Sequence, residues 1–154
     1  MTIPARGRLL GIDMGNVRIG LAVCDVDHRM ASPLGQYQRQ AREQDRAYFA
    51  NLVTKEQIAG LIVGLPIHMN GSEGTQAKAY REYGDWLAGS LALPVAYADE
   101  RLTTFAAEDL LWDAGLTHAK RKARRDQLAA TFILQHFLEM ERSAGMAPVE
   151  ERPT

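Results

Sequence analysis

The residues best placed for chemistry are acids that interrupt or end apolar segments. Asp13 follows the apolar residues 9–12 and lies between Gly11 and Gly15. A carboxylate in an apolar strand is costly unless a cation or hydrogen bonds compensate for its charge. The glycines remove side chains beside it, so that a phosphate or a metal ion can approach the backbone. Asp13 is therefore either a metal ligand in a phosphate-processing site or a cap on the turn that follows it.

A second pair of acids ends another apolar segment. Asp99 and Glu100 follow residues 95–98, and ligand sites in α/β sheets collect at the carboxyl ends of strands. Neighbouring residues of a strand point to opposite faces, so only one of these two carboxylates faces a given crevice. Arg101, the next residue, is either a structural partner of Asp99 or a contact to substrate.

A third acid lies early in the last segment with helical patterning. Asp126 precedes Ala130, Ile133 and Phe137 at helical spacing, which predicts that it lies on the face packed against the sheet. The helix dipole favours an acid near a helix start, but that explains an exposed Asp rather than a buried one. The cations of residues 120–125 come just before Asp126. They form either a solvated stretch or a rim that guides phosphates toward the acid.

Together, Asp13, Glu100 and Asp126 would form a carboxylate cluster without histidine or cysteine ligands. Hard oxygen ligands suit Mg²⁺ or Mn²⁺. Two such ions roughly 4 Å apart activate a water and stabilise the leaving 3′-oxygen in phosphodiester hydrolysis. Without metal, the three acids would repel one another and raise each other's pKa values. The combination favours the metal-ligand interpretation of Asp13 over the turn cap.

The elements that must position these acids form a mixed α/β sheet. Three strands joined by short turns at residues 15–16 and 27–28 predict an antiparallel meander, and the helix–strand alternation that follows predicts helices on both faces. We expect strands at residues 8–14, 17–25, 30–36, 60–65 and 95–99, and helices at residues 42–57, 75–91, 103–114 and 125–142. The basic stretch precedes the last helix, and a loose tail follows about residue 143.

Composition narrows the class of protein. The 154 residues are the size of one domain, and the single cysteine, Cys24, excludes a disulfide framework and a cysteine-based zinc cluster. No apolar run approaches the roughly 18 residues that span a bilayer, and an aspartate precedes any run long enough for a signal peptide. We therefore expect a cytoplasmic protein. The net charge of −1 conceals the local basic stretch and does not argue against a nucleic-acid partner.

Four segments, taken in order, resemble the YqgF/RuvX family of RNase H-like proteins. They are GIDMGNVRIGLAVCD (residues 11–25), GLPIHMNGSEGTQA (64–77), ADERLTT (98–104) and RRDQLAATFILQHFL (124–138), within a resemblance that covers about residues 9–138. The resemblance implies an RNase H-like five-stranded sheet of order 3-2-1-4-5, with strand 2 antiparallel and helices on both faces. It implies a nuclease domain, which we place over residues 1–143, and the acidic triad Asp13, Glu100 and Asp126. The prolines and scattered charges of residues 144–154 predict a flexible tail.

The sequence departs from the family pattern in two places. The loop after the fourth strand has Asn70 where the family often has an acid. Asn70 is still able to contact a backbone phosphate, and the nearby His68 is either a proton-transfer group or a plain loop residue. Related junction resolvases carry a fourth acid near the third, whereas Gln, Leu and Ala follow Asp126 at residues 127–129. We therefore expect both ions to bind only when substrate is present.

The function implied by the resemblance is a Mg²⁺- or Mn²⁺-dependent endonuclease. Its substrate would be structured RNA, in 5′-end maturation of pre-16S rRNA, or branched DNA, in Holliday junction resolution. Asp13 would bridge the ions, and Glu100 and Asp126 would each hold one. Paired cuts on a junction would require two active sites and hence a homodimer. The residues expected to hold the phosphate backbone are Arg18, Asn70, Arg101, Lys120, Arg121, Lys122, Arg124 and Arg125.

Two other functions remain open at this point. A non-catalytic ribosome-assembly factor would bind rRNA through the same basic residues. A nucleotide-binding protein of the actin/sugar-kinase superfamily also carries a DxG turn in its first strand, but that superfamily clasps its nucleotide between two domains and this chain has the length of one. Other nucleotide motifs are absent, because Gly11, Gly15 and Gly20 lack GxGxxG spacing and no GK[ST] sequence occurs.

Overall fold

A computed structural model describes residues 1–66, 71, 73–99 and 117–145, without the side chains of residues 118 and 121–127. The strands are β1 (Arg8–Asp13), β2 (Arg18–Cys24), β3 (Ala31–Gln38), β4 (Ile58–Leu65) and β5 (Val95–Asp99). The helices are α1 (Arg42–Glu56), α2 (Thr75–Leu91) and α4 (His118–Gly145). The helix expected at residues 103–114 and most of the expected tail lie outside the described residues. No described helix is both long and apolar enough to span a membrane.

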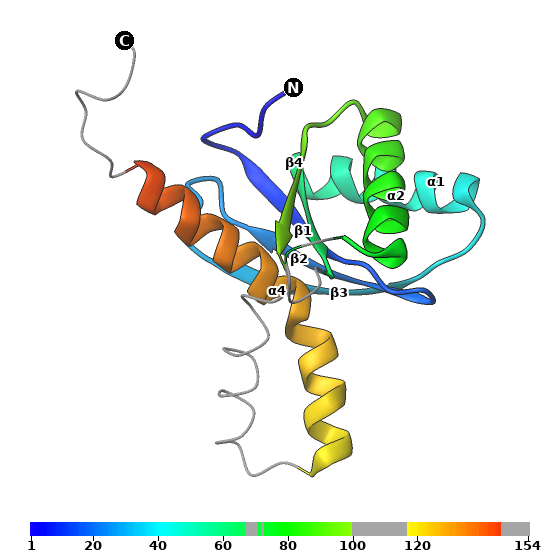
Figure 1. Ribbon diagram of the computed structural model, residues 1–154. Coiled ribbons are helices and arrows are strands. Elements are labelled where there is room, and N and C mark those ends of the chain that lie inside the picture. Colours follow the sequence, from blue (N-terminus) through cyan, green and yellow to red (C-terminus); the bar gives the residue numbers. More distant parts are fainter. Residues whose placement is uncertain (67–70, 72, 100–116, 146–154) are drawn as a thin grey trace.

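The five strands form one mixed sheet of order β3-β2-β1-β4-β5. β2 is antiparallel to both β1 and β3, while β4 is parallel to β1 and β5 is parallel to β4. Figure 1 shows α1 and α2 on one face of this sheet and α4 on the other. The predicted sheet order, the antiparallel second strand and the helices on both faces are therefore confirmed.

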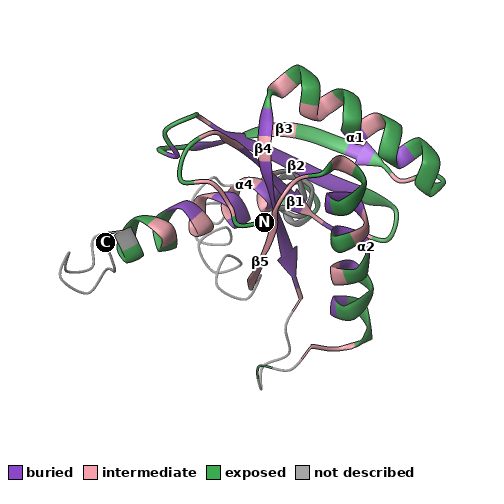
Figure 2. Ribbon diagram, turned by 90° about the horizontal axis from the view of Figure 1, so that it is seen from above, coloured by how far each residue is buried: buried purple, intermediate pink, exposed green. Residues whose placement is uncertain are grey.

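Each face of the sheet has its own apolar core, and Figure 2 shows that burial concentrates in the strands β1, β2 and β4. The α1–α2 face buries every second residue of β1, including Leu10 and Ile12, against α1 and α2. The α4 face buries Leu9 of β1 and Ile62 of β4 against the helix. The helix contributes Ala130, Ile133, Leu134 and Leu138. This burial confirms the expected apolar face of the last helix.

α4 begins earlier than the sequence pattern predicts. It starts at His118, so the basic residues 120–125 lie in its first two turns and do not precede it. The expectation of a basic stretch before the helix is wrong because Thr117 acts as the N-cap, with its Oγ1 accepting a hydrogen bond from the backbone N–H of Lys120 at 3.3 Å. Lysine, arginine and alanine then continue the helix, since all three have high helix propensity. These first turns, yellow in Figure 1, extend past the sheet.

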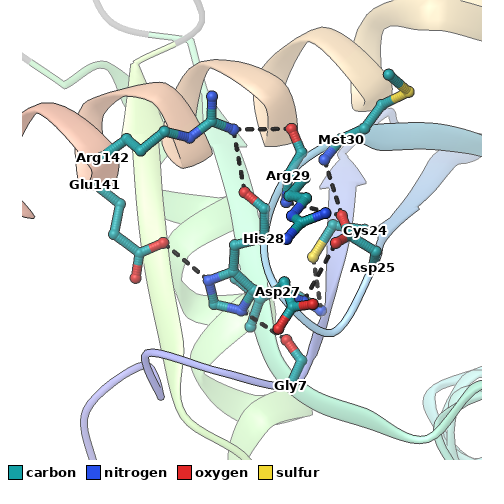
Figure 3. A network of polar contacts seen from close by, with 10 residues as sticks. Gly7, Cys24, Asp25, Asp27, His28, Arg29, Met30, Glu141 and Arg142 are labelled. Carbon is teal, nitrogen blue, oxygen red and sulfur yellow. Dashed lines mark hydrogen bonds and ion pairs between the residues drawn. The ribbon is translucent and has the colours of Figure 1, made fainter.

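The course of α4 is fixed at two points along β1. A Cβ atom placed on Gly11, in the middle of the strand, would lie 3.0 Å from the carbonyl oxygen of Ala130. Just before the strand, the His28 ring lies 2.6 Å from the carbonyl oxygen of Gly7 and 3.0 Å from the carboxylate of Glu141 (Figure 3). α4 therefore runs antiparallel to β1. Its residues before Ala130 lie toward the carboxyl end of β1, where Asp13 is.

Candidate active site

Asp13 is the last residue of β1 and is half-buried. Side chains alternate along a strand, so Asp13 shares the α4 face with Leu9 and Gly11. Its partners in the neighbouring strands are Gly20 of β2 and Gly64 of β4. The strand positions directly beside Asp13 therefore carry no side chain.

The glycines next to Asp13 in sequence have structural roles. A Cβ atom on Gly11 would lie 2.8 Å from Cβ of Leu134, so this glycine lets α4 approach the sheet. A Cβ atom on Gly15 would lie 2.4 Å from the carbonyl oxygen of Arg18, so this glycine permits the tight turn into β2. The expectation that Gly11 and Gly15 make room for a ligand is wrong, because protein atoms occupy the space beside both.

The β1–β2 turn is held from two other elements. Arg39, just after β3, donates from its backbone N–H to the carbonyl of Val17 at 2.8 Å and from Nη1 to the carbonyl of Gly15 at 3.0 Å. The Tyr80 hydroxyl of α2 donates to Oδ1 of Asn16 at 3.1 Å. These contacts fix the backbone immediately after Asp13. No local sequence signal identified Arg39 or Tyr80, because both reach the turn from distant parts of the chain.

The buried carboxylate of Asp45 holds the aromatic side chains next to Arg39. Oδ1 of Asp45 accepts hydrogen bonds from the Tyr37 hydroxyl at 2.7 Å and the Gln40 backbone N–H at 2.8 Å, and Oδ2 accepts one from the Tyr83 hydroxyl at 2.8 Å. Burial, and then the acceptor Asp45, raise the pKa of the Tyr83 phenol. The network therefore holds a neutral ring beneath Arg39. An acid four residues before the core residue Phe49 was the available sequence signal.

Asp99, the last residue of β5, does not lie on the sheet face of Asp13. Ala96 and Ala98 pack on the α4 side, whereas Tyr97 packs on the α1–α2 side. Asp99 follows the alternation of Tyr97 and so lies on the face opposite Asp13. Glu100 lies outside the described residues, as does the proposed pairing of Asp99 with Arg101.

Asp126 belongs to α4, one helical turn before Ala130. Its side chain lies outside the described part, so its convergence with Asp13 and Glu100 stays a prediction. Within the described residues, no three His, Cys, Asp or Glu side chains gather as a metal site. The residues of α4 before Ala130 nevertheless lie toward the end of β1 that bears Asp13.

A sequence profile of the RuvX family, described as Holliday junction resolvase, matches residues 7–140. The chain belongs to the RuvX family. A relative in Rhodopirellula baltica, named "Putative pre-16S rRNA nuclease", is 43% identical over 142 residues, which are 92% of this chain and 82% of the relative. A relative of the same name in Chloroflexus aurantiacus is 42% identical over 135 residues, with 88% of both chains covered.

Solved structures agree on the fold of this RuvX protein. RuvC of T. thermophilus in complex with a Holliday junction substrate superposes with a TM-score of 0.57 at 16% identity, covering 88% of this chain and 96% of RuvC. A second Thermus thermophilus RuvC structure gives a TM-score of 0.53 at 14% identity, with the same coverage. The RNase H-like fold expected from the sequence is therefore confirmed.

The expected phosphate contacts of the RuvX chain are only partly described. Arg18 is exposed at the start of β2, on the α4 side like its strand neighbours Gly20 and Ala22. Lys120 is exposed on the first turn of α4. Four more cations belong to the same two turns, with side chains outside the description: Arg121, Lys122, Arg124 and Arg125. Three other expected site residues lie outside the described residues entirely: His68, Asn70 and Arg101.

Proposed function

We propose that this RuvX protein is a cytoplasmic, metal-dependent endonuclease that hydrolyses phosphodiester bonds in structured RNA. The observation that carries the proposal is the position of Asp13. It ends β1 between Gly20 of β2 and Gly64 of β4, on the sheet face that α4 crosses. The names of the relatives, which refer to pre-16S rRNA, favour 5′-end maturation of that precursor as the reaction. Branched DNA is the alternative substrate, since the family description refers to Holliday junctions.

Three carboxylates would hold the metal ions. Asp13, Glu100 and Asp126 would each contribute oxygen ligands to Mg²⁺ or Mn²⁺. The strand alternation supports Glu100 over Asp99, because position 100 has the parity of Ala96 and Ala98 on the α4 side. The antiparallel course of α4 supports Asp126. Oxygen ligands alone fit these hard cations.

The bound ions would supply a nucleophilic water and charge stabilisation for the leaving 3′-oxygen. The chain's own task is to hold the substrate so that the scissile phosphate meets the carboxylates. We assign this task to Arg18, Asn70, Arg101 and the cations of residues 120–125, which would contact the sugar–phosphate backbone. Arg18 and Lys120, the described members, are exposed and so are accessible to a polyanion.

The deciding experiment compares Asp13→Asn with Asp27→Asn. Asparagine keeps the shape of Asp13 but removes the charge that binds the metal, so cleavage should fall by roughly three orders of magnitude or more. Asp27 is a surface acid paired with Arg6, and its substitution should leave cleavage unchanged. Both variants are assayed on a pre-16S 5′ leader and on a Holliday junction while Mg²⁺ or Mn²⁺ is titrated.

Each outcome has a distinct meaning. Wild-type cleavage by Asp13→Asn would remove Asp13 from the catalytic site and refute the proposal. RNA binding that survives EDTA, with no cleavage by the wild-type protein at any metal concentration, would identify a non-catalytic assembly factor instead. Faster cleavage of the junction than of the leader would make branched DNA the substrate.

A further inference from the structure

Two arginines stack on aromatic rings beside the turn that follows Asp13. The guanidinium carbon of Arg39 lies 4.6 Å from the centroid of the Tyr83 ring. That of Arg42 lies 5.6 Å from the same ring and 4.8 Å from the centroid of Trp86. We call Arg39, Arg42 and Trp86, together with the buried Tyr83 ring that the arginines contact, the arginine–aromatic surface. They come from the segment after β3, from the start of α1 and from α2.

Within the part of the chain that the structure describes, no ion pair neutralises the positive charge of this surface. The ion pairs among the described residues are Arg6–Asp27, Arg8–Glu56, His28–Glu141 and Arg81–Glu73. Arg39 and Arg42 therefore form none there, although both approach one ring and repel each other. Asp45, beneath that ring, weakens the local positive field, but the hydrogen bonds to its two oxygens come from Tyr37, Gln40 and Tyr83. Among the described residues, Arg39 and Arg42 are thus cations without an ion-pair partner.

Contact with the aromatic rings prepares these cations to bind a phosphate. A guanidinium held against an aromatic ring loses less freedom when its N–H donors bind an oxyanion. Arg42 is exposed and Trp86 is half-buried, so both are open to a partner. Arginine and aromatic side chains together are also the groups that bind single-stranded nucleic acid through its phosphates and bases.

The position of the surface connects it to the catalytic edge. Arg39 donates to the carbonyl of Gly15, two residues after Asp13. The arginine–aromatic surface therefore begins where β1 ends and continues over the α1–α2 side. The basic first turns of α4 belong to the opposite side of the sheet. A nucleic acid that crosses the edge at Asp13 has cations available on both sides.

We infer that the arginine–aromatic surface binds the sugar–phosphate backbone of the substrate on the side of the scissile bond away from α4. The inference rests on the proposed nuclease function and adds a second binding surface to it. Arg42 would hold a phosphate directly. Arg39 would contribute charge while it also fixes the turn after Asp13.

The test uses Arg42→Gln, Arg42→Lys and, as a charge-matched control, Lys55→Gln. Lys55 is exposed in the last turn of α1, at the end remote from Asp13, so both Gln variants lose one positive charge from the same helix. Binding of the pre-16S leader is measured in EDTA over a series of salt concentrations, and KM and kcat are measured with Mn²⁺. Thermal unfolding verifies that each variant is folded.

We expect Arg42→Gln to weaken binding about tenfold and to reduce the slope of log Kd against log salt by about 1, the value for one lost phosphate contact. KM should rise with kcat unchanged, Arg42→Lys should restore the salt slope, and Lys55→Gln should behave as wild type. Shortening the substrate on one side of the cleavage site should abolish the difference between Arg42→Gln and wild type.

Two results would overturn the inference. Equal affinities and slopes for Arg42→Gln and Lys55→Gln, with cleavage by wild type intact, would remove the arginine–aromatic surface and leave the nuclease proposal standing. Absence of both binding and cleavage in the wild-type protein would overturn the two proposals together.

Discussion

The packing of α4 on Gly11 gives a sharp prediction about how the site is positioned. In Gly11→Ala, the new Cβ would lie 2.8 Å from Cβ of Leu134 and 3.0 Å from the carbonyl oxygen of Ala130. Ordinary contact begins at 3.4 Å, so the helix and the strand must separate by about 0.6 Å. Neither opposing atom belongs to the flexible end of a side chain, and the strain cannot be relieved by a rotamer change.

We expect this overpacking to cost about 1–3 kcal/mol, reduced by up to about 1 kcal/mol because alanine lowers the entropy of the unfolded chain. The urea midpoint should fall by the corresponding amount at unchanged m-value. The cleavage rate should fall by more than the loss of folded protein explains, because Asp126 belongs to the displaced helix. Misplacement of a catalytic group by roughly 1 Å costs on the order of 10²-fold in rate.

The matched control is Gly89→Ala in α2. No atom lies within 4 Å of a Cβ placed on Gly89, and the residue is exposed within a helix. The same chemical change should there stabilise the protein by about 0.5–1 kcal/mol. Adding Leu134→Ala to Gly11→Ala should not restore stability, because the close atom is the Cβ that alanine retains. Rescue by that second substitution, or a wild-type urea midpoint for Gly11→Ala itself, would refute the reasoning.

Two further predictions concern stability. Burial and the acceptor Asp45 raise the pKa of Tyr37 to about 12. The phenol of the unfolded chain ionises near pH 10. The contribution of Tyr37 to stability is therefore complete below about pH 10 and is lost as the pH rises toward 12. The free energy of unfolding should fall with pH over that range, and Tyr37→Phe should reduce the slope of this fall. Glu141→Ala removes an acceptor from the buried His28 ring and should cost about 1–3 kcal/mol, whereas Glu139→Ala, at an exposed position, should change the melting temperature little.

The sheet could be predicted because its signals are local. Short turns bring β1, β2 and β3 together, and the continuous apolar run of β4 marks a strand covered on both faces. The start of α4 was predicted too late because a dense run of cations is typical of a solvated stretch, although Thr117, three residues before Lys120, is an N-cap signal. Contacts between distant segments, such as Arg39 with Gly15, leave no local pattern to detect.

The role of the glycines could not be deduced from one strand. Gly11 and Gly15 flank Asp13 in sequence, yet both are required by neighbouring protein atoms. Gly20 and Gly64 lie 7 and 51 positions away, and only the strand register places them beside the carboxylate. Proximity in the sequence therefore pointed to glycine as the residue type beside Asp13, but to the wrong glycines.

Asp99 and Glu100 show how topology decides what composition leaves open. Asp99 ends β5 and Glu100 follows it in the sequence, and the sequence establishes only that one of them faces a given crevice. The register Asp13–Gly64–Ala98 across three strands assigns the α4 face to even-numbered residues of β5, which excludes Asp99 from the face of Asp13. The same face is the one that α4 approaches so closely at Gly11. The proposed metal site of Asp13, Glu100 and Asp126 would therefore depend on the sheet register and on the absence of a side chain at Gly11, as well as on the acids themselves.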